Sequence, residues 1–212
     1  MTVVAAYIDG DGEAMVFSDS CGSSSDGATA RRHDAIKTIR FNDSWALALA
    51  GNNYGAGLIG SALYGNDIIC QDTFARIEEL GLVRNDLDGE GAVSFFGRYF
   101  AQSGAWIPAI TADCHVLLTG SDGVGQRLYR WPSEQDGWEK PQEYEIKDSG
   151  NILVLVAPDR ISWLDVGIPA EDAVGVLLKH YAKRFPSMVD RNLRIRRRSH
   201  KFELDPVIVG ED

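Results

Sequence analysis

Cysteine and histidine, the side chains that most often bind metals, are scarce in this sequence. The 212 residues include 3 cysteines and 4 histidines, and neither type shows the spacing of a metal site. Three cysteines also leave one without a partner in any disulfide scheme, which is typical of a reducing compartment. We therefore expect a cytoplasmic protein that needs no metal and no other cofactor.

Positive charge and long apolar runs are lacking as well. Lys and Arg total 21 against 31 Asp and Glu, so the formal net charge is -10. Nucleic acids and anionic membrane surfaces attract an excess of positive charge, so neither is an expected partner. No run of about 18 apolar residues occurs, and the start has no basic segment followed by an apolar one. The sequence thus predicts neither a membrane span nor a secretion signal.

The composition nevertheless supplies a full hydrophobic core. Hydrophobic residues make up 44% and charged residues 25% of the chain, which is typical of a globular protein. A chain of this length fits a single domain over residues 1–212.

The first two residues place a hydroxyl directly behind the initiator methionine. Methionine aminopeptidases act when the second residue is small, and Thr2 qualifies. Without Met1, Thr2 would carry both a nucleophile and a free α-amine. Such an amine suits the role of base, because its unperturbed pKa of about 7.7–8.0 leaves part of it neutral at pH 7. Thr2 is therefore a candidate nucleophile for a reaction that passes through an acyl-enzyme ester.

Apolar alternation predicts four strands in the first quarter of the chain. They cover residues 3–8, 14–17, 35–41 and 45–50. The two Asp-Gly pairs of Asp9-Gly10-Asp11-Gly12 favour a hairpin turn between the first two strands, and Asn42-Asp43 supplies a turn between the other two. A calcium loop is the rival interpretation of the acidic turn, but its later glycine and terminal glutamate are missing.

Four features of this region occur together in order and spacing: Thr2, Asp19-Ser20, Lys37 and Ala50-Gly51. They resemble the pattern of the proteasome β-subunit superfamily, including HslV-type peptidases, over residues 2–60. The resemblance implies that Thr2 is the catalytic nucleophile. It also implies that Asp19 and Lys37 form its charged support and that the backbone N–H of Gly51 belongs to the oxyanion hole.

The chemistry of these side chains agrees with those roles. A buried lysine beside the nucleophile would make the hydroxyl more acidic and keep the α-amine neutral by repulsion, and Asp19 would keep Lys37 charged. In the same register, the substrate-pocket positions of the family fall on Ser23, Ala35, Leu49 and Asn53. These side chains are uncharged, which implies a preference for apolar or neutral substrate side chains.

The rest of the chain follows the order of elements in the family. Helical patterns cover 55–64, 72–80, 91–102 and 169–184, and strand patterns cover 115–120, 126–131 and 152–156. The glycines of residues 120–125 lie between two strands, and no Gly-Lys-Ser or Gly-Lys-Thr follows them. They therefore predict a hairpin rather than a phosphate-binding loop.

Two parts of the family pattern are missing. Where the family has a Gly-Ser-Gly loop after a strand, this chain continues from Ala157 to Ser162 without glycine, and either Ser162 or Ser149 is left as a substitute. The later Asp-x-x-Ser pair of the family has no counterpart at the expected place after the helices. These gaps leave open a catalytically silent subunit that acts as a scaffold.

The segment after the last helical pattern is rich in basic residues. They are Arg191, Arg194, Arg196, Arg197, Arg198, His200 and Lys201. A solvated strand face and a contact surface for an acidic patch on a neighbouring subunit are both consistent with this cluster. A nucleic-acid site is disfavoured, because the chain is acidic and few aromatic residues lie among the basic ones.

The resemblance implies an α+β fold, a four-layer αββα sandwich of two antiparallel sheets between helices. It implies a threonine-type N-terminal nucleophile peptidase that acts on peptides or unfolded proteins within a homo-oligomeric ring, for which an ATPase is a candidate partner. A silent structural subunit and an amidase acting on a small metabolite are the alternatives.

Overall fold

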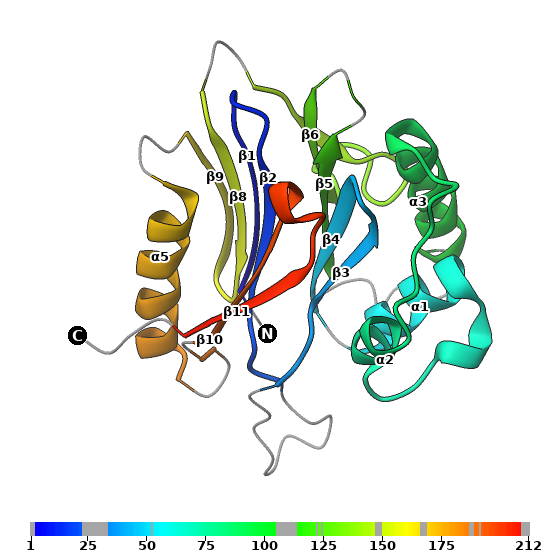
Figure 1. Ribbon diagram of the computed structural model, residues 1–212, viewed down its shortest axis with the longest axis horizontal. Helices are drawn as coiled ribbons and strands as arrows, with labels where there is room; N and C mark the ends of the chain where they lie inside the picture. The colour runs from blue at the N-terminus through cyan, green and yellow to red at the C-terminus, as the bar shows by residue number, and fades with distance from the viewer. Residues whose placement is uncertain are drawn as a thin grey trace.

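Two antiparallel sheets lie face to face with helices on both outer sides (Figure 1). The computed structural model describes residues 3–22, 34–51, 53–104, 114–121, 123, 125–146, 150–165, 169–186, 189–190 and 192–208. In Figure 1, α5 (Ala170–Arg184) covers the outer side of one sheet, and α1 (Asn53–Tyr64), α2 (Thr73–Glu79) and α3 (Gly89–Gly104) cover the other. This arrangement confirms the predicted αββα sandwich.

The first sheet contains both ends of the described chain. Its order is β11-β10-β2-β1-β8-β9. The strands are β1 (Val4–Ile8), β2 (Ala14–Asp19), β8 (Ile152–Ala157), β9 (Arg160–Asp165), β10 (Asn192–Arg197) and β11 (Leu204–Ile208). The 3₁₀ turn η2 (Arg198–His200) follows β10. The predicted first hairpin is confirmed, because β1 pairs with β2 from Val4 opposite Ser18 to Ile8 opposite Ala14.

In the acidic turn of this hairpin, the Asp9 carboxylate binds backbone groups of the turn itself. The Oδ1 atom of Asp9 accepts the backbone N–H groups of Asp11 at 3.0 Å and Glu13 at 2.8 Å. The carboxylate thus satisfies the turn backbone. Across the described residues, no group of three His, Cys, Asp or Glu side chains is placed to hold a metal ion.

The second sheet has the order β3-β4-β5-β6-β7. Its strands are β3 (Thr38–Asn42), β4 (Trp45–Ala50), β5 (His115–Ser121), β6 (Gln126–Trp131) and β7 (Gln142–Tyr144), and the 3₁₀ turn η1 (Asn66–Ile68) follows α1. Strand β3 lies at one edge, and the predicted central hairpin is present as the pair β5 and β6. None of the described helices is long and apolar enough to cross a membrane.

The four layers follow from strands that are apolar on both faces. In β4, the large residues Trp45, Leu47 and Leu49 pack against the helices, and the alanines between them face the first sheet. In β1, alternate residues face α5 and the second sheet in the same way. Small side chains on the inner face let the two sheets approach closely, while the large ones fill the space under the helices.

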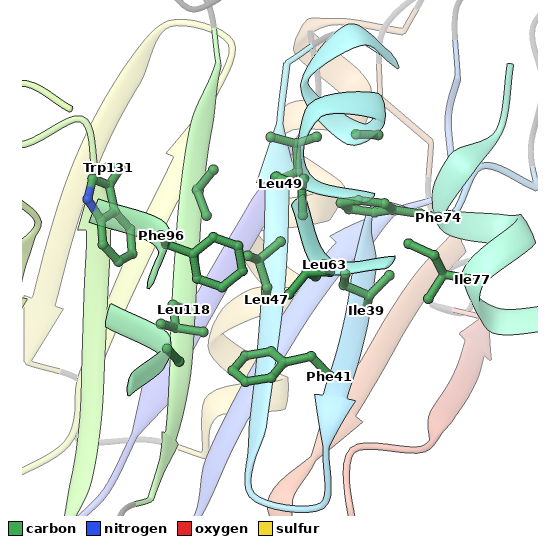
Figure 2. Close-up of a cluster of buried hydrophobic side chains, with 14 of the residues drawn as sticks. Ile39, Phe41, Leu47, Leu49, Leu63, Phe74, Ile77, Phe96, Leu118 and Trp131 are labelled. Carbon is green, nitrogen blue, oxygen red and sulfur yellow. The ribbon is translucent and has the colours of Figure 1, made fainter. Parts of the chain in front are cut away.

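Figure 2 shows the cluster between the second sheet and α1–α3. Phe96 of α3 packs against Phe41 of β3 and Trp131 of β6, with ring centroids 6.1 and 6.4 Å apart. Leu49, at the end of β4, lies in the same cluster. The cluster therefore fixes the end of β4, from which the candidate site is built.

Candidate active site

An ion pair connects the end of β2 with the start of β3. Asp19 is the last residue of β2, and Lys37 directly precedes β3. The Lys37 Nζ atom lies 2.7 Å from Asp19 Oδ1, and the two side chains are 12% and 0% exposed. The structure thus brings together two residues that the sequence analysis assigned to one site, in an environment where their attraction is weakly screened.

The same carboxylate also binds the beginning of the chain. Asp19 Oδ1 accepts the backbone N–H of Val3 at 2.9 Å, and Oδ2 accepts that of Cys21 at 3.1 Å. The Val3 nitrogen belongs to the peptide bond with Thr2, so the Lys37 ammonium is two hydrogen bonds away from that bond. Thr2 itself lies outside the described residues.

A second buried carboxylate, which the sequence analysis missed, holds the neighbouring residue. Asp190 Oδ1 accepts the backbone N–H of Ser20 at 3.0 Å, and its Oδ2 accepts the Ser20 hydroxyl at 2.9 Å. Asp190 lies between α5 and β10, and the sequence analysis found no counterpart of the family's later Asp-x-x-Ser pair after the helices. It is 170 residues from Ser20 in sequence, and nothing in its local sequence distinguishes it from an ordinary turn residue.

Two of the predicted pocket residues are attached to this site through the backbone. The Leu49 N–H donates to the Lys37 carbonyl at 2.8 Å, and the Ala35 N–H donates to the Ser20 carbonyl at 3.0 Å. The Leu49 side chain is buried and Ala35 is half-buried. The other two predicted pocket positions are not placed, because Ser23 and the side chain of Asn53 lie outside the described residues.

Gly51 follows β4 at the same end of the sheets, two residues after Leu49. Its φ of 140° lies in the region that favours glycine. A Cβ atom there would be 2.5 Å from the Sγ and 2.9 Å from the Cα of Cys114. Both the backbone and the space thus require glycine. Helix α1 begins at Asn53, and its N-terminal end adds partial positive charge beside this backbone, which is chemically suited to a developing oxyanion.

Gly51→Ala is expected to destabilise the fold through two separate effects. Positive φ costs about 1–3 kcal/mol in a residue with a side chain, and the contact with Cys114 adds about 1–3 kcal/mol of overpacking. Gly65→Ala is the matched control, since Gly65 also has a positive φ, 91°, but a Cβ atom added there would have nothing within 4 Å. Urea unfolding of both variants measures the difference. Equal losses of unfolding free energy would show that the space beside Cys114 is not restrictive.

The serine proposed to replace the missing loop is not at the end of a strand. Residues 157–160 form the tight turn between β8 and β9, with Ala157 opposite Arg160. Ser162 lies inside β9 opposite Leu155, which is part of the cluster under α5. Its hydroxyl has no hydrogen-bond partner among the described residues. Ser149, the other substitute, lies outside them.

Acidic side chains of the same chain match much of the charge in the basic cluster. The pairs are Arg196 with Glu78, Arg197 with Glu171 and Asp205, and Lys201 with Asp43, and the His200 ring lies 3.4 Å from Asp205. Arg191 lies outside the described residues. These pairs form within one chain and join β10 and the η2 segment to the rest of the molecule.

A scan against models of protein families found no match, and a search among curated proteins found no relative. Among solved structures, the chain is similar to "Anbu (ancestral beta-subunit)" from Yersinia bercovieri, with 14% identity and a TM-score of 0.58. It is also similar to the Anbu (Gly-1) mutant from Hyphomicrobium sp. strain MC1, with 12% identity and a TM-score of 0.60. Both alignments cover 100% of this chain and 88% of the other.

These findings correct the assignment made from the sequence. The assignment to proteasome β-subunits and HslV-type peptidases was wrong, because no family model matches and the similar solved structures described above are Anbu proteins. Identities of 12% and 14% establish a proteasome-like fold alone. The function therefore has to be argued from the site.

Proposed function

We propose that this protein is a threonine-type N-terminal nucleophile hydrolase that cleaves peptide bonds. The observation that carries the proposal is the shared acceptor Asp19 Oδ1, which binds both the Lys37 ammonium and the Val3 N–H. One buried carboxylate thus fixes a positive charge beside the residue that follows Thr2. A lysine with no task at this end of the sheets would be expected in solvent, where its charge is best solvated.

The reaction follows from the groups at this end of the molecule. The Thr2 hydroxyl attacks the carbonyl carbon of the scissile amide, and the α-amine of Thr2 takes the hydroxyl proton. The Gly51 N–H donates to the developing oxyanion. The C–N bond then breaks, the leaving amine takes the proton back, and an acyl ester remains on Thr2. Water, deprotonated by the same amine, hydrolyses this ester and regenerates Thr2.

Lys37 and Asp19 support the nucleophile electrostatically. An ammonium at this position disfavours a second positive charge on the α-amine, so the amine stays neutral and able to accept a proton. The Asp19 carboxylate holds Lys37 in place and compensates its charge. The neighbouring uncharged residues Ala35 and Leu49 favour substrates with apolar or neutral side chains.

The test is a reagent that needs a hydroxyl and a free amine on one residue. A peptide α′,β′-epoxyketone with an apolar side chain should form a double adduct at Thr2, because only the α-nitrogen of the attacking residue can open the epoxide by ring closure. Intact mass should show the loss of Met1 and the addition of one reagent, and peptide mapping should place both at Thr2. A protein that retains Met1, or that has a free Thr2 and forms no adduct, would contradict the proposal.

A second candidate is a catalytically silent subunit. The observation that favours it is the tight β8–β9 turn, which puts Ser162 inside the strand rather than at the turn. The same mass spectrum separates the two functions, because a silent subunit with a free Thr2 would remain unmodified at reagent concentrations that saturate an active hydrolase.

A further inference from the structure

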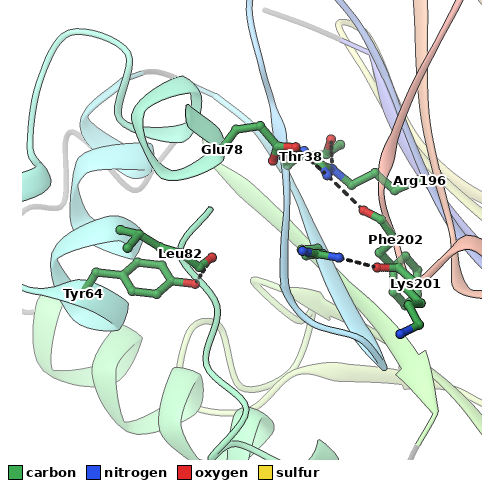
Figure 3. Close-up of polar contacts among 8 residues, drawn as sticks. Thr38, Tyr64, Glu78, Leu82, Arg196, Lys201 and Phe202 are labelled. Atoms are coloured by element: carbon green, nitrogen blue, oxygen red, sulfur yellow. Dashed lines mark hydrogen bonds and ion pairs between the residues drawn. The ribbon is translucent and has the colours of Figure 1, made fainter. Parts of the chain in front are cut away.

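Arg196 of β10 is a fully buried arginine that joins three elements (Figure 3). Its Nε donates to the Thr38 hydroxyl at 2.9 Å and its Nη2 to the Thr38 carbonyl at 3.1 Å. Nη2 also lies 2.7 Å from Glu78 Oε2 of α2, and Nη1 donates to the Phe202 carbonyl at 2.9 Å. One guanidinium thus connects the first sheet, the edge strand of the second sheet and a helix of the outer layer.

Strand β3 has no neighbouring strand on its outer side among the described residues. A carbonyl on such an edge normally binds water or another chain. Here the Thr38 carbonyl binds Arg196 instead, and the preceding residue is Lys37. On the other side, the Lys37 carbonyl accepts the Leu49 N–H at 2.8 Å. The backbone that carries Lys37 is therefore held from both sides.

The acceptor beyond Arg196 is part of a strained turn. Lys201 and Phe202 have φ values of 53° and 56°, which side chains other than glycine rarely adopt. Both of their carbonyls accept from arginines, Lys201 from Arg40 at 3.4 Å and Phe202 from Arg196 at 2.9 Å. The buried Phe202 ring packs between the sheets and fixes the turn. The Phe202 carbonyl that accepts from the Arg196 guanidinium is therefore fixed in place.

The energetics point to position rather than stability as the role of this side chain. The pKa of Arg196 is lowered, because the effect of burial exceeds the opposing effect of Glu78. A buried ion pair contributes little net stability compared with apolar residues of the same size, although removing one partner alone is costly. What the planar guanidinium adds is a fixed geometry toward several acceptors. That geometry ends on Thr38, next to the lysine of the candidate site.

We propose that Arg196 is a positioning residue that sets the place of Lys37 by fixing both oxygen atoms of Thr38. This inference rests on the proposed function for its catalytic consequence, but the anchoring of β3 can be measured independently. Arg196 touches no reacting atom, so its effect passes through the backbone at Thr38 and Lys37. Misplacing a catalytic group by about 1 Å costs on the order of 100-fold in rate.

The test compares Arg196→Met with Arg197→Met. Arg197 is the matched control, since it lies on the same strand and is ion-paired, but its partners are Glu171 and Asp205 rather than residues of β3. With the epoxyketone, Arg196→Met should lower the maximal inactivation rate about tenfold or more with the concentration for half-saturation unchanged. Arg197→Met should stay within about twofold of the wild type, because surface pairs contribute little. Arg196→Lys should restore little of the inactivation rate, because lysine lacks the planar guanidinium that binds several acceptors.

Hydrogen exchange gives the second readout, which does not depend on Thr2. The Leu49 amide should exchange about tenfold faster in Arg196→Met, relative to the amides of β8, and should be unchanged in Arg197→Met. If wild type forms no adduct, the proposed function fails and this exchange alone decides the anchoring. Should Arg196→Met not fold, Thr38→Val, which removes only the hydroxyl acceptor, takes its place in both measurements. Unchanged exchange and unchanged inactivation in the folded variant would overturn the inference.

Discussion

Thr2→Ala is expected to abolish both the epoxyketone adduct and amide hydrolysis, whereas Thr2→Ser should retain both. Alanine keeps the α-amine and the small second residue that allows Met1 removal, and it lacks the hydroxyl and the γ-methyl group of threonine. Loss of a catalytic nucleophile lowers the rate by on the order of 10⁶-fold. Serine supplies the same oxygen without the methyl group and is expected to form the same ester.

The measurements are intact mass after reagent treatment and the release rate of a fluorophore from a neutral peptide amide. Circular dichroism of the three proteins serves as the control for folding. Because Thr2 precedes the first described strand, the substitution should leave the sheets unchanged. If Thr2→Ala hydrolysed the peptide at the wild-type rate, the nucleophile would be another residue and the mechanism proposed above would be wrong.

The ion pair of the candidate site joins two residues that are close in sequence. Asp19 and Lys37 lie only 18 residues apart, at the facing ends of two strands whose apolar alternation is clear. Either residue alone is typical of a turn or of a solvated strand, so their pairing was implied by the resemblance rather than by the pattern of each strand. The resemblance likewise implied the layered fold, and strands that are apolar on both faces explain it, because they need a layer on each side.

What the sequence did not predict depends on contacts between distant segments. Asp190 and Ser20 are 170 residues apart, and Arg196 and Thr38 are 158 apart. The cluster around Arg196 was interpreted as a solvated face or a subunit contact, because spacing alone cannot show that acceptors from α2 and β3 surround a guanidinium. Strands β7, β9 and β11 were missed too. Residues 157–162 were compared with the loop that follows this strand in the family, and Pro206 interrupts the pattern of β11.

The error in the family assignment has a related cause. A few motif residues specify a turn, a glycine with positive φ and an ion pair, and these features belong to the fold rather than to one family. Gly51 illustrates this, because its φ of 140° and its contact with Cys114 require glycine whatever reaction the protein performs. Such positions identify the architecture correctly and leave the choice among its families undetermined.

Lys37→Ala is expected to lower the rate of hydrolysis by about 10³-fold while the protein stays folded. Without the ammonium, more of the Thr2 α-amine is protonated at neutral pH, and less of it can accept the hydroxyl proton. The fold should survive, because the Asp19 carboxylate still accepts the N–H groups of Val3 and Cys21. Breaking the buried pair should nevertheless cost about 3 kcal/mol of unfolding free energy.

Asp19→Asn and Lys183→Ala test whether the loss of rate comes from the missing lysine charge or from lower stability. Asp19→Asn keeps Lys37 and an oxygen that can accept the Val3 N–H, so we expect a smaller fall in rate than for Lys37→Ala. Lys183 lies exposed at the end of α5, in the outer layer, and its replacement should change neither rate nor stability. Rates for all three variants are compared with unfolding free energies from urea titration. A rate loss that follows the loss of unfolding free energy across the series would assign Lys37 a structural role. A rate loss far larger than the loss of stability explains would place the lysine charge in the reaction.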